Sequence, residues 1–124
     1  MKFSEIILKS EAKIFLGKNA ENNDELVKEF KGKENIIIHT VEPGSPFCVI
    51  EKLNPTKKEI QEAAIICASK SHDWRDNKKD VNVCVFSGKE VYKINGMKTG
   101  TWGVRKKENK IKVKKEDILR VLKR

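Results

Sequence analysis

The chain has 124 residues, of which 36% are charged and 38% hydrophobic, and its formal net charge at pH 7 is +9. This length predicts a single domain over residues 1–124 with a modest core. No apolar run approaches the roughly 18 residues of a membrane-spanning helix. Residues 6–8 are apolar, but they are too few and too closely flanked by charges for a signal peptide. We therefore expect a cytoplasmic protein without a membrane partner.

The first part of the chain predicts a β-hairpin followed by a helix. Residues 3–9 and 13–16 are short apolar runs on either side of a turn. Residues 22–31 carry apolar side chains at i, i+1 and i+4, which is typical of a helix with one buried face. Asn22 or Asn23 is the expected N-cap, because a short amide side chain can accept from the first free backbone N–H groups.

Residues 36–50, IIIHTVEPGSPFCVI, predict a strand, a tight turn and a second strand. β-branched runs favour strands, and Pro-Gly is a strong turn signal. His39, Ser45 and Phe47 are then expected together at one end of a sheet. Loops that a rigid sheet supports often carry binding groups, so this turn is a candidate for the more specific part of a binding site.

The longest predicted helix covers residues 57–71. Thr56 and Glu59 match the capping box, in which each side chain accepts from the other residue's backbone N–H. Alanine, cysteine and serine recur at three- and four-residue spacing along its inner side, so the helix can pack closely against a sheet. Residues 72–79 read as a polar loop, in which we expect Trp74 to be partly exposed.

Residues 81–86, VNVCVF, alternate like a strand and are mostly apolar on both sides, which predicts a central strand. Three short extended segments follow at 91–94, 101–105 and 110–113, and the chain ends in a helix over 116–124. The predicted fold class is α+β: a mostly antiparallel mixed sheet with one long helix (about 57–71) and shorter helices (about 22–31 and 116–124).

Positive charge is concentrated at the end of the chain. Residues 88–124 hold 13 Lys and Arg against 4 Asp and Glu, whereas the residues before them hold 14 of each kind. Apolar residues are interleaved throughout this basic segment, so we expect it to be folded rather than a solubilising tail. A folded basic surface predicts a polyanion as partner, with nucleic acid or the ribosome ahead of membrane phosphates.

The sequence contains no pattern that requires catalysis. The three cysteines, Cys48, Cys67 and Cys84, lack the spacing of zinc ligands, and each stands singly among apolar residues as a buried reduced thiol does. No phosphate-binding loop has the required spacing. Cys48 could pair with His39 as a nucleophile, although a buried inert thiol is about ten times more frequent. No cofactor and no metal are therefore expected.

Two aromatic residues stand beside cations, as in proteins that stack on unpaired bases and neutralise phosphates. These groups are Trp74 with Arg75, and Trp102 with Arg105, Lys106 and Lys107. The alternative for Trp102 is a core position on a strand, and His39 is as compatible with a structural role as with a functional one. No base-reading motif is present, so recognition of RNA shape and backbone is favoured.

Four motifs follow one another between about residues 16 and 113. They are the run 16–26 (LGKNAENNDEL), Ile38-His39 with Pro43-Gly44-Ser45, the alanine-rich helix that ends at Ser71, and Val91-Tyr92-Lys93 with Gly96, Lys98 and Gly100. In this order they resemble the NFACT-R domain family, the RNA-binding module of ribosome-associated quality-control factors, which also occurs as stand-alone archaeal proteins. Long members of that family commonly have His directly after Gly-Ser, where this chain has Pro46-Phe47.

The resemblance implies a non-catalytic RNA-binding domain that acts on the ribosome, ribosomal RNA or tRNA in translation or quality control. The expected RNA-binding residues are His39, Ser45, Phe47, Ser71, Trp74, Arg75, Lys93, Lys98, Trp102, Arg105, Lys106 and Lys107. The large ribosomal subunit is an expected partner, as is a protein that supplies the other domains of the long factors. Two alternatives stay open: a nucleic-acid-processing enzyme that uses the His39/Ser45 turn, and a basic adaptor that binds an acidic translation or degradation factor.

Overall fold

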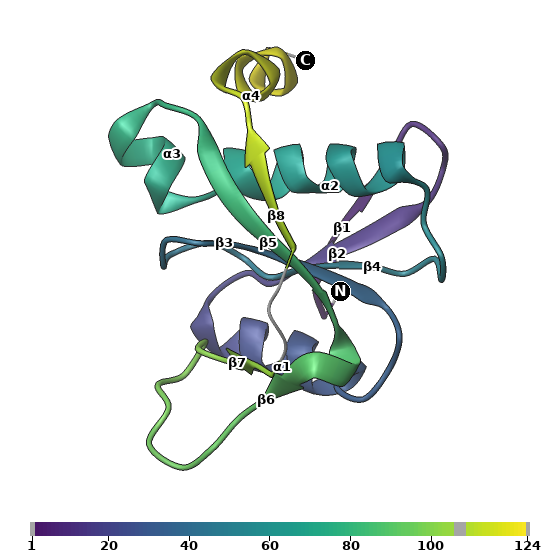
Figure 1. Ribbon diagram of the computed structural model, residues 1–124, viewed down its shortest axis with the longest axis vertical. Helices are drawn as coiled ribbons and strands as arrows, with labels where there is room; N and C mark the ends of the chain where they lie inside the picture. Colours follow the sequence, from purple (N-terminus) through teal and green to yellow (C-terminus); the bar gives the residue numbers. More distant parts are fainter. Residues whose placement is uncertain (1, 106–108, 124) are drawn as a thin grey trace.

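A six-stranded antiparallel sheet organises the fold (Figure 1). The computed structural model describes residues 2–105 and 109–123. In spatial order the sheet contains β1 (Ser4–Ile7), β2 (Lys13–Leu16), β4 (Cys48–Ile50), β3 (Ile36–Thr40), β5 (Val81–Ser87) and β8 (Asn109–Val113). A separate two-stranded sheet is formed by β6 (Val91–Tyr92) and β7 (Gly103–Val104). The predicted α+β class is confirmed.

Helices cover both faces of the sheet. They are α1 (Ala20–Phe30), α2 (Lys57–Ser69), α3 (His72–Asn77) and α4 (Lys115–Leu122), and a 3-10 turn spans Gly88–Glu90. The second, third and fourth helices lie above the sheet in Figure 1, whereas α1 and the β6–β7 pair lie below it. We call these two sides the α2 face and the α1 face.

Alternation along β5 explains why both faces are apolar. Val81, Val83 and Val85 pack in the core on the α2 face, whereas Cys84 and Phe86 pack in the second core on the α1 face. Successive side chains of a strand point to opposite sides. The strand is interior but not central, because only β8 lies beyond it.

The long helix begins as the sequence predicts. Thr56 accepts from the backbone N–H of Glu59, and Glu59 accepts from the backbone N–H of Thr56, so the capping box is complete. The Glu59 carboxylate also accepts from Ser10 and Lys52, and its side chain is buried. This one carboxylate therefore connects the helix N-terminus to the β1–β2 turn.

The acid stability of the protein should depend on Glu59. Its partners Ser10, Thr56 and Lys52 lower its pKa from 4.5 to about 2. A carboxylate with a lowered pKa in the folded state stabilises above its unfolded pKa, and the stabilisation is lost as pH falls through the folded value. We expect the free energy of unfolding to fall between about pH 4.5 and pH 2, and to fall less steeply in Glu59→Gln, as measured by urea unfolding. Equal slopes for both proteins would contradict this assignment.

Helix α1 begins earlier than the expected residue 22. Its N-cap is Asn19, whose side chain accepts from the backbone N–H of Asn22. Asn22 and Asn23 are not caps but buried residues inside the helix. Asn22 donates to the backbone of Lys2, and Asn23 binds the backbone around Ser45. The prediction of the cap was wrong because these long-range partners are invisible in the local pattern.

The expected polar loop over 72–79 is a short helix, α3. Ser71 is its N-cap, and the Ser71 hydroxyl accepts from the backbone N–H of Trp74. The capped turn directs Trp74 into the core on the α2 face, where it is 4% exposed. The prediction that Trp74 is partly exposed is therefore wrong.

The segment between β3 and β4 is longer than a tight turn. The strands pair at Ile37 with Val49 and at Ile38 with Cys48, and residues 41–47 connect them. The three cysteines are buried and form no disulfide, as expected. No helix within residues 2–105 and 109–123 is long and apolar enough to cross a membrane.

Candidate RNA-binding face

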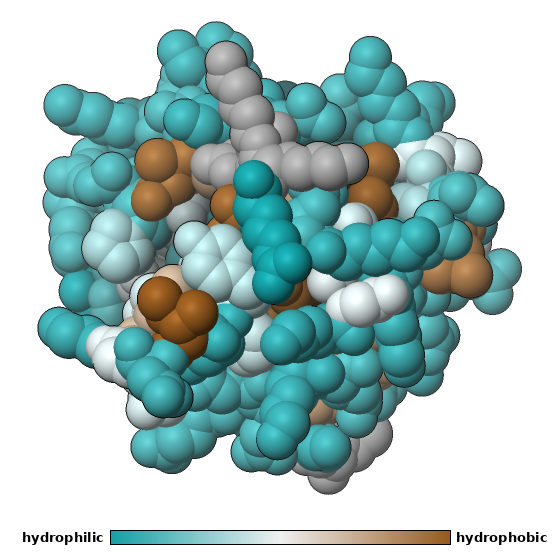
Figure 2. Space-filling model, turned by 60° about the horizontal axis from the view of Figure 1, so that its bottom comes forward, coloured by the Kyte–Doolittle hydropathy of each residue, from teal (hydrophilic) through white to brown (hydrophobic). Residues whose placement is uncertain are grey.

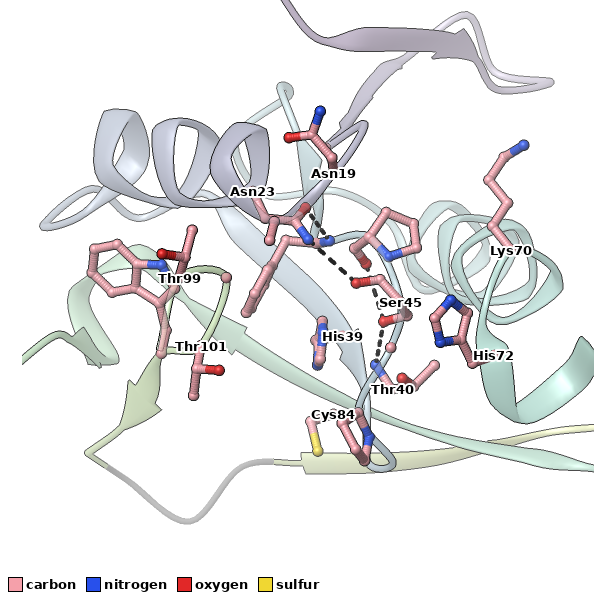
Figure 3. A pocket seen from close by; sticks show the side chains of 18 of the residues that line it. Asn19, Asn23, His39, Thr40, Ser45, Lys70, His72, Cys84, Thr99 and Thr101 are labelled. Atoms are coloured by element: carbon pink, nitrogen blue, oxygen red, sulfur yellow. Dashed lines mark hydrogen bonds between the residues drawn. The ribbon is translucent and has the colours of Figure 1, made fainter. Parts of the chain in front are cut away.

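A hollow of about 970 Å³ opens on the α1 face of the sheet (Figure 3). His39, Cys84 and Phe86 contribute its floor. The start of α1, the 43–47 segment with His72, and the 99–102 segment form its sides. Parts of the chain that are far apart in sequence therefore meet at one concave site.

His39 is held on this floor by an aromatic stack. Its ring lies 4.1 Å from the Phe47 ring, centroid to centroid, at an interplanar angle of 23°. Burial lowers the pKa of His39, although hydrogen bonds with the backbone of Thr40 and Ser45 act in the opposite direction. At neutral pH the ring is therefore an uncharged, fixed aromatic surface.

Helix α1 positions the Ser45 turn through one amide. Asn23 Oδ1 accepts from the backbone N–H of Phe47 at 3.0 Å, and Asn23 Nδ2 donates to the carbonyl of Ser45 at 3.4 Å. Ser45 Oγ accepts from the backbone N–H of Thr40 at 3.4 Å. These contacts are drawn in Figure 3, and they fix the wall of the hollow to both a strand and a helix.

Gly44 is required where the turn approaches α3. It has a φ of +92°, and a Cβ atom there would overlap the His72 ring. The carbonyl of Gly44 accepts from the backbone N–H of His72 at 2.7 Å. Left-handed backbone costs an L residue about 1–2 kcal/mol, and the overlap adds to that cost.

Gly44→Ala should therefore lower the free energy of unfolding by about 2 kcal/mol. Chemical denaturation monitored by circular dichroism measures the change. Gly32→Ala is the matched control, because Gly32 also has a positive φ, +84°, but no atom lies within 4 Å of the place that a Cβ would occupy. Equal losses in the two variants would contradict the role of the His72 contact.

Asp24 holds the opposite wall. Its Oδ1 atom accepts from Lys93 Nζ, the backbone N–H of Gly100 and Trp102 Nε1, each at 2.9 Å. Lys93 also lies 5.3 Å above the Trp102 ring. Gly100 packs against Ala20 at the start of α1. One half-buried carboxylate therefore fixes the aromatic wall in place.

A row of paired residues extends from the hollow to the edge of the sheet. His39 pairs with Cys84, and Cys84 pairs with Lys110 on β8. Directly opposite residues of an antiparallel pair share a face, so Lys110 projects on the side of the hollow. Lys112 projects there too, beside Asn82, because it lies two residues further along the strand. Both lysines are exposed.

A second, shallower hollow of about 490 Å³ adjoins this edge. Its lining includes Asn82 and Lys112, and four of its seven residues are lysines: Lys78, Lys79, Lys112 and Lys115. Cys84 in the first hollow and Asn82 in the second lie two residues apart on β5. The two hollows therefore follow each other along one strand, with cations gathered at the outer end.

A family model described as the NFACT protein RNA binding domain matches residues 2–106. The chain belongs to the NFACT RNA-binding domain family. This membership confirms the resemblance carried by the four sequence motifs and points to RNA as the partner.

The NFACT RNA-binding chain also shares its fold with a solved structure. That structure is the C-terminal part of the fibronectin/fibrinogen-binding protein from Streptococcus suis, with a TM-score of 0.83 and 23% identity. The similarity covers 98% of this chain and 49% of that chain, so the present chain spans about half of its length. Comparison with curated proteins found no match.

The structure brings four of the predicted site residues of this NFACT RNA-binding domain to one place. His39, Ser45, Phe47 and Trp102 all border the first hollow. Phe47 is 3% exposed, so its role there is to support the His39 ring.

The other predicted residues lie elsewhere. Ser71 caps α3 and is 2% exposed, and Trp74 is buried on the α2 face. Arg75 is exposed and paired with Asp76.

The predicted residues of the basic segment also lie outside the hollow, apart from Trp102. Lys93 and Lys98 do not border it; Lys93 is held by Asp24, and the carbonyl of Lys98 accepts from Lys93. Arg105 is exposed, with its guanidinium 5.6 Å from the Tyr92 ring centroid. Lys106 and Lys107 fall outside the described residues.

Several residues of this candidate site are not among the residues that the sequence predicts for it. Asn23 and Asp24 lie inside the LGKNAENNDEL motif. The signal for their role in holding the walls was their place as adjacent polar residues on a helix that also carries an apolar stripe. His72 lies in the segment that the sequence predicts as a polar loop. Lys110 and Lys112 alternate with Ile111 and Val113, and this alternation does predict two lysines on one face of a strand.

Cys48 and His39 cannot act as a pair in this fold. Cys48 pairs with Ile38 and lies in the core on the α2 face, whereas His39 faces the opposite side. Burial raises the pKa of the Cys48 thiol well above its ordinary value, so the thiol stays protonated. Among the described residues, no three His, Cys, Asp or Glu side chains gather as a metal site requires.

Proposed function

We propose that this chain is a non-catalytic RNA-binding domain that engages ribosomal RNA or tRNA in translation or ribosome-associated quality control. The observation that carries the proposal is the single face on which a hollow with aromatic walls leads to the lysines of β8. Membership in the NFACT RNA-binding domain family supports RNA as the ligand.

The charge distribution supports the same face. The excess of 9 positive charges lies in residues 88–124, and β8 belongs to this segment. Lys110 and Lys112 have no ion pair among the described residues, whereas Lys114 lies 3.9 Å from Asp80. Cations without a carboxylate partner are available to phosphate oxygens.

The hydropathy of the neighbouring surface favours a polar partner over a protein with an apolar interface. Figure 2 shows the side of the molecule below α1 and the β6–β7 pair as mostly hydrophilic, with apolar side chains in separate patches. A stable protein interface usually has a larger apolar centre. If the partner is a protein, a polar surface of this kind fits an acidic one, so a basic adaptor that binds an acidic factor is the second candidate.

The proposal also covers partners and location in the cell. A protein partner that supplies the other domains of the long quality-control factors is part of the proposal. Three buried cysteines without a disulfide are consistent with a cytoplasmic location. The large ribosomal subunit is the proposed site of action.

Crosslinking in cells followed by sequencing of the bound RNA tests the proposal. We expect enrichment of ribosomal RNA or tRNA over messenger RNA, and a strong reduction for a Lys110→Glu/Lys112→Glu variant. Recovery of a protein partner that survives nuclease treatment, without enriched RNA, would instead support the adaptor.

A further inference from the structure

Among the aromatic side chains that border the hollow, His39 and Trp102 come from different parts of the fold. His39 contributes to the floor, and Trp102 contributes to the wall formed by residues 99–102. Each is already oriented before a ligand binds: the Phe47 stack holds His39, and Asp24 holds the Trp102 indole N–H. Aromatic surfaces that are fixed in advance lose little conformational entropy when a flat ligand stacks on them.

Both rings border the same hollow, although a neighbouring side chain covers part of each. Phe47 covers one face of His39, and Lys93 lies over the Trp102 ring. Both residues nevertheless border the hollow. Its volume of about 970 Å³ lies at the upper end of the range for small-ligand pockets. A nucleobase with its ribose therefore fits without rearrangement of the sheet.

Hydroxyl groups that do not select one base over another line the rim of the hollow. Thr99 and Thr101 are exposed and border the hollow, and Figure 3 shows them on the side opposite Lys70 and His72. A hydroxyl can either donate or accept, so these groups can meet any of the four bases. This rim suits one unpaired base without strong sequence preference.

Lys110 and Lys112 lie at a suitable distance to contact the backbone of an RNA whose base occupies the hollow. Neighbouring strands are about 4.8 Å apart, so Lys110, two strands away from His39, has its Cα about 10 Å from that of His39. The long lysine side chains can span much of this gap. A nucleotide in the hollow therefore places its flanking phosphates within reach of β8.

We propose that the hollow receives a single extruded base of RNA, stacked on His39 and Trp102, while Lys110 and Lys112 hold the adjacent phosphates. This inference rests on the proposed RNA-binding function and names the part of the RNA that the site recognises. An unpaired nucleotide in a loop or bulge is the ligand, and a continuous duplex cannot offer a base to the hollow.

Binding of short oligoribonucleotides tests this pocket directly. The probe is a single-stranded octanucleotide, compared with an abasic octamer of the same backbone and charge. Base–aromatic stacking corresponds to roughly a 5- to 150-fold gain in affinity per base. We expect the base-bearing octamer to bind more tightly by a factor in this range, with quenching of Trp102 fluorescence. Trp74→Phe provides a background in which Trp102 is the only tryptophan, since the chain has two.

A matched pair of variants separates stacking from folding. His39→Ala should reduce the difference between the two octamers, because only Trp102 then remains to stack on the base, whereas His39→Phe should keep it, because the phenyl ring can still stack. Circular dichroism checks that both variants are folded, and the affinity of each variant for the abasic octamer reports separately on the phosphate contacts of Lys110 and Lys112.

The possible results separate this inference from the proposed function. If both octamers bind equally and Trp102 fluorescence does not change, the base pocket is wrong and only backbone binding remains. If neither octamer nor any longer RNA binds, the proposed function itself is overturned, and the base pocket is overturned with it.

Discussion

Replacement of Lys110 and Lys112 by glutamate is expected to weaken RNA binding about 25-fold or more at 0.1 M salt. Each phosphate contact to single-stranded RNA contributes a slope of about −0.7 to the plot of log affinity against log salt, which corresponds to roughly 5-fold in affinity at 0.1 M relative to 1 M salt. Both side chains are exposed and project on the face that carries the hollow. The slope should therefore fall by about 1.4. Fluorescence anisotropy titrations at several salt concentrations measure both quantities.

Lys57→Glu/Lys58→Glu is the matched control for this experiment. Both lysines are exposed, and they lie at the start of α2, on the opposite side of the sheet. The variant has the same change in net charge, and acidic residues in the first turn of a helix do not destabilise it. If the control weakens binding as much as the β8 variant, only overall charge matters and the assigned face is wrong.

Replacement of Asp24 by alanine should disrupt the aromatic wall. Three donors lose their shared acceptor: Lys93 Nζ, the Gly100 N–H and Trp102 Nε1. Hydrogen bonds to charged groups contribute about 1.5–3 kcal/mol each in well-ordered sites. Because Asp24 is partly exposed, we expect a total loss of about 2–3 kcal/mol in the free energy of unfolding. RNA affinity should fall about 10-fold, because the Trp102 ring is no longer fixed.

Asp24→Asn distinguishes the hydrogen bonds from the charge. The amide oxygen can still accept from Gly100 and Trp102, but the ion pair with Lys93 is lost. We expect a loss of less than about 1 kcal/mol and nearly normal RNA affinity. A variant Asp24→Ala with unchanged stability and unchanged Trp102 fluorescence would show that the carboxylate does not hold this wall.

Local patterns in the sequence predicted most of the secondary structure. The capping box at Thr56 and Glu59, the β2 strand at 13–16 and the alternating β5 strand all depend on neighbouring residues, and all three are present. The burial of the three cysteines without a disulfide also follows from their apolar neighbours. These features need no information about the rest of the fold.

The errors occurred where a partner far along the chain decides the structure. Asn22 and Asn23 have the side chains of typical caps, but their partners are the backbones of Lys2, Ser45 and Phe47. Trp74 stands among polar residues, yet the cap at Ser71 directs it into the core. A local window contains none of these contacts.

The candidate site was predictable in part for the same reason. His39, Ser45 and Phe47 are close in sequence, so a strand followed by a turn was enough to group them. The contribution of Asp24 to the Trp102 wall links residues 78 positions apart. The position of Lys110 beside the hollow depends on the order of β3, β5 and β8 in the sheet, which sequence alone does not specify.

The most direct test of the central claim is to map where RNA touches the protein. The purified chain is crosslinked to ribosomal RNA or tRNA with ultraviolet light, and the modified peptides are identified by mass spectrometry. We expect crosslinks in the peptides that contain His39, residues 99–102 and the β8 strand, because these border the two hollows or the edge between them. Crosslinks confined to α2, on the other side of the sheet, would contradict the assigned RNA-binding face.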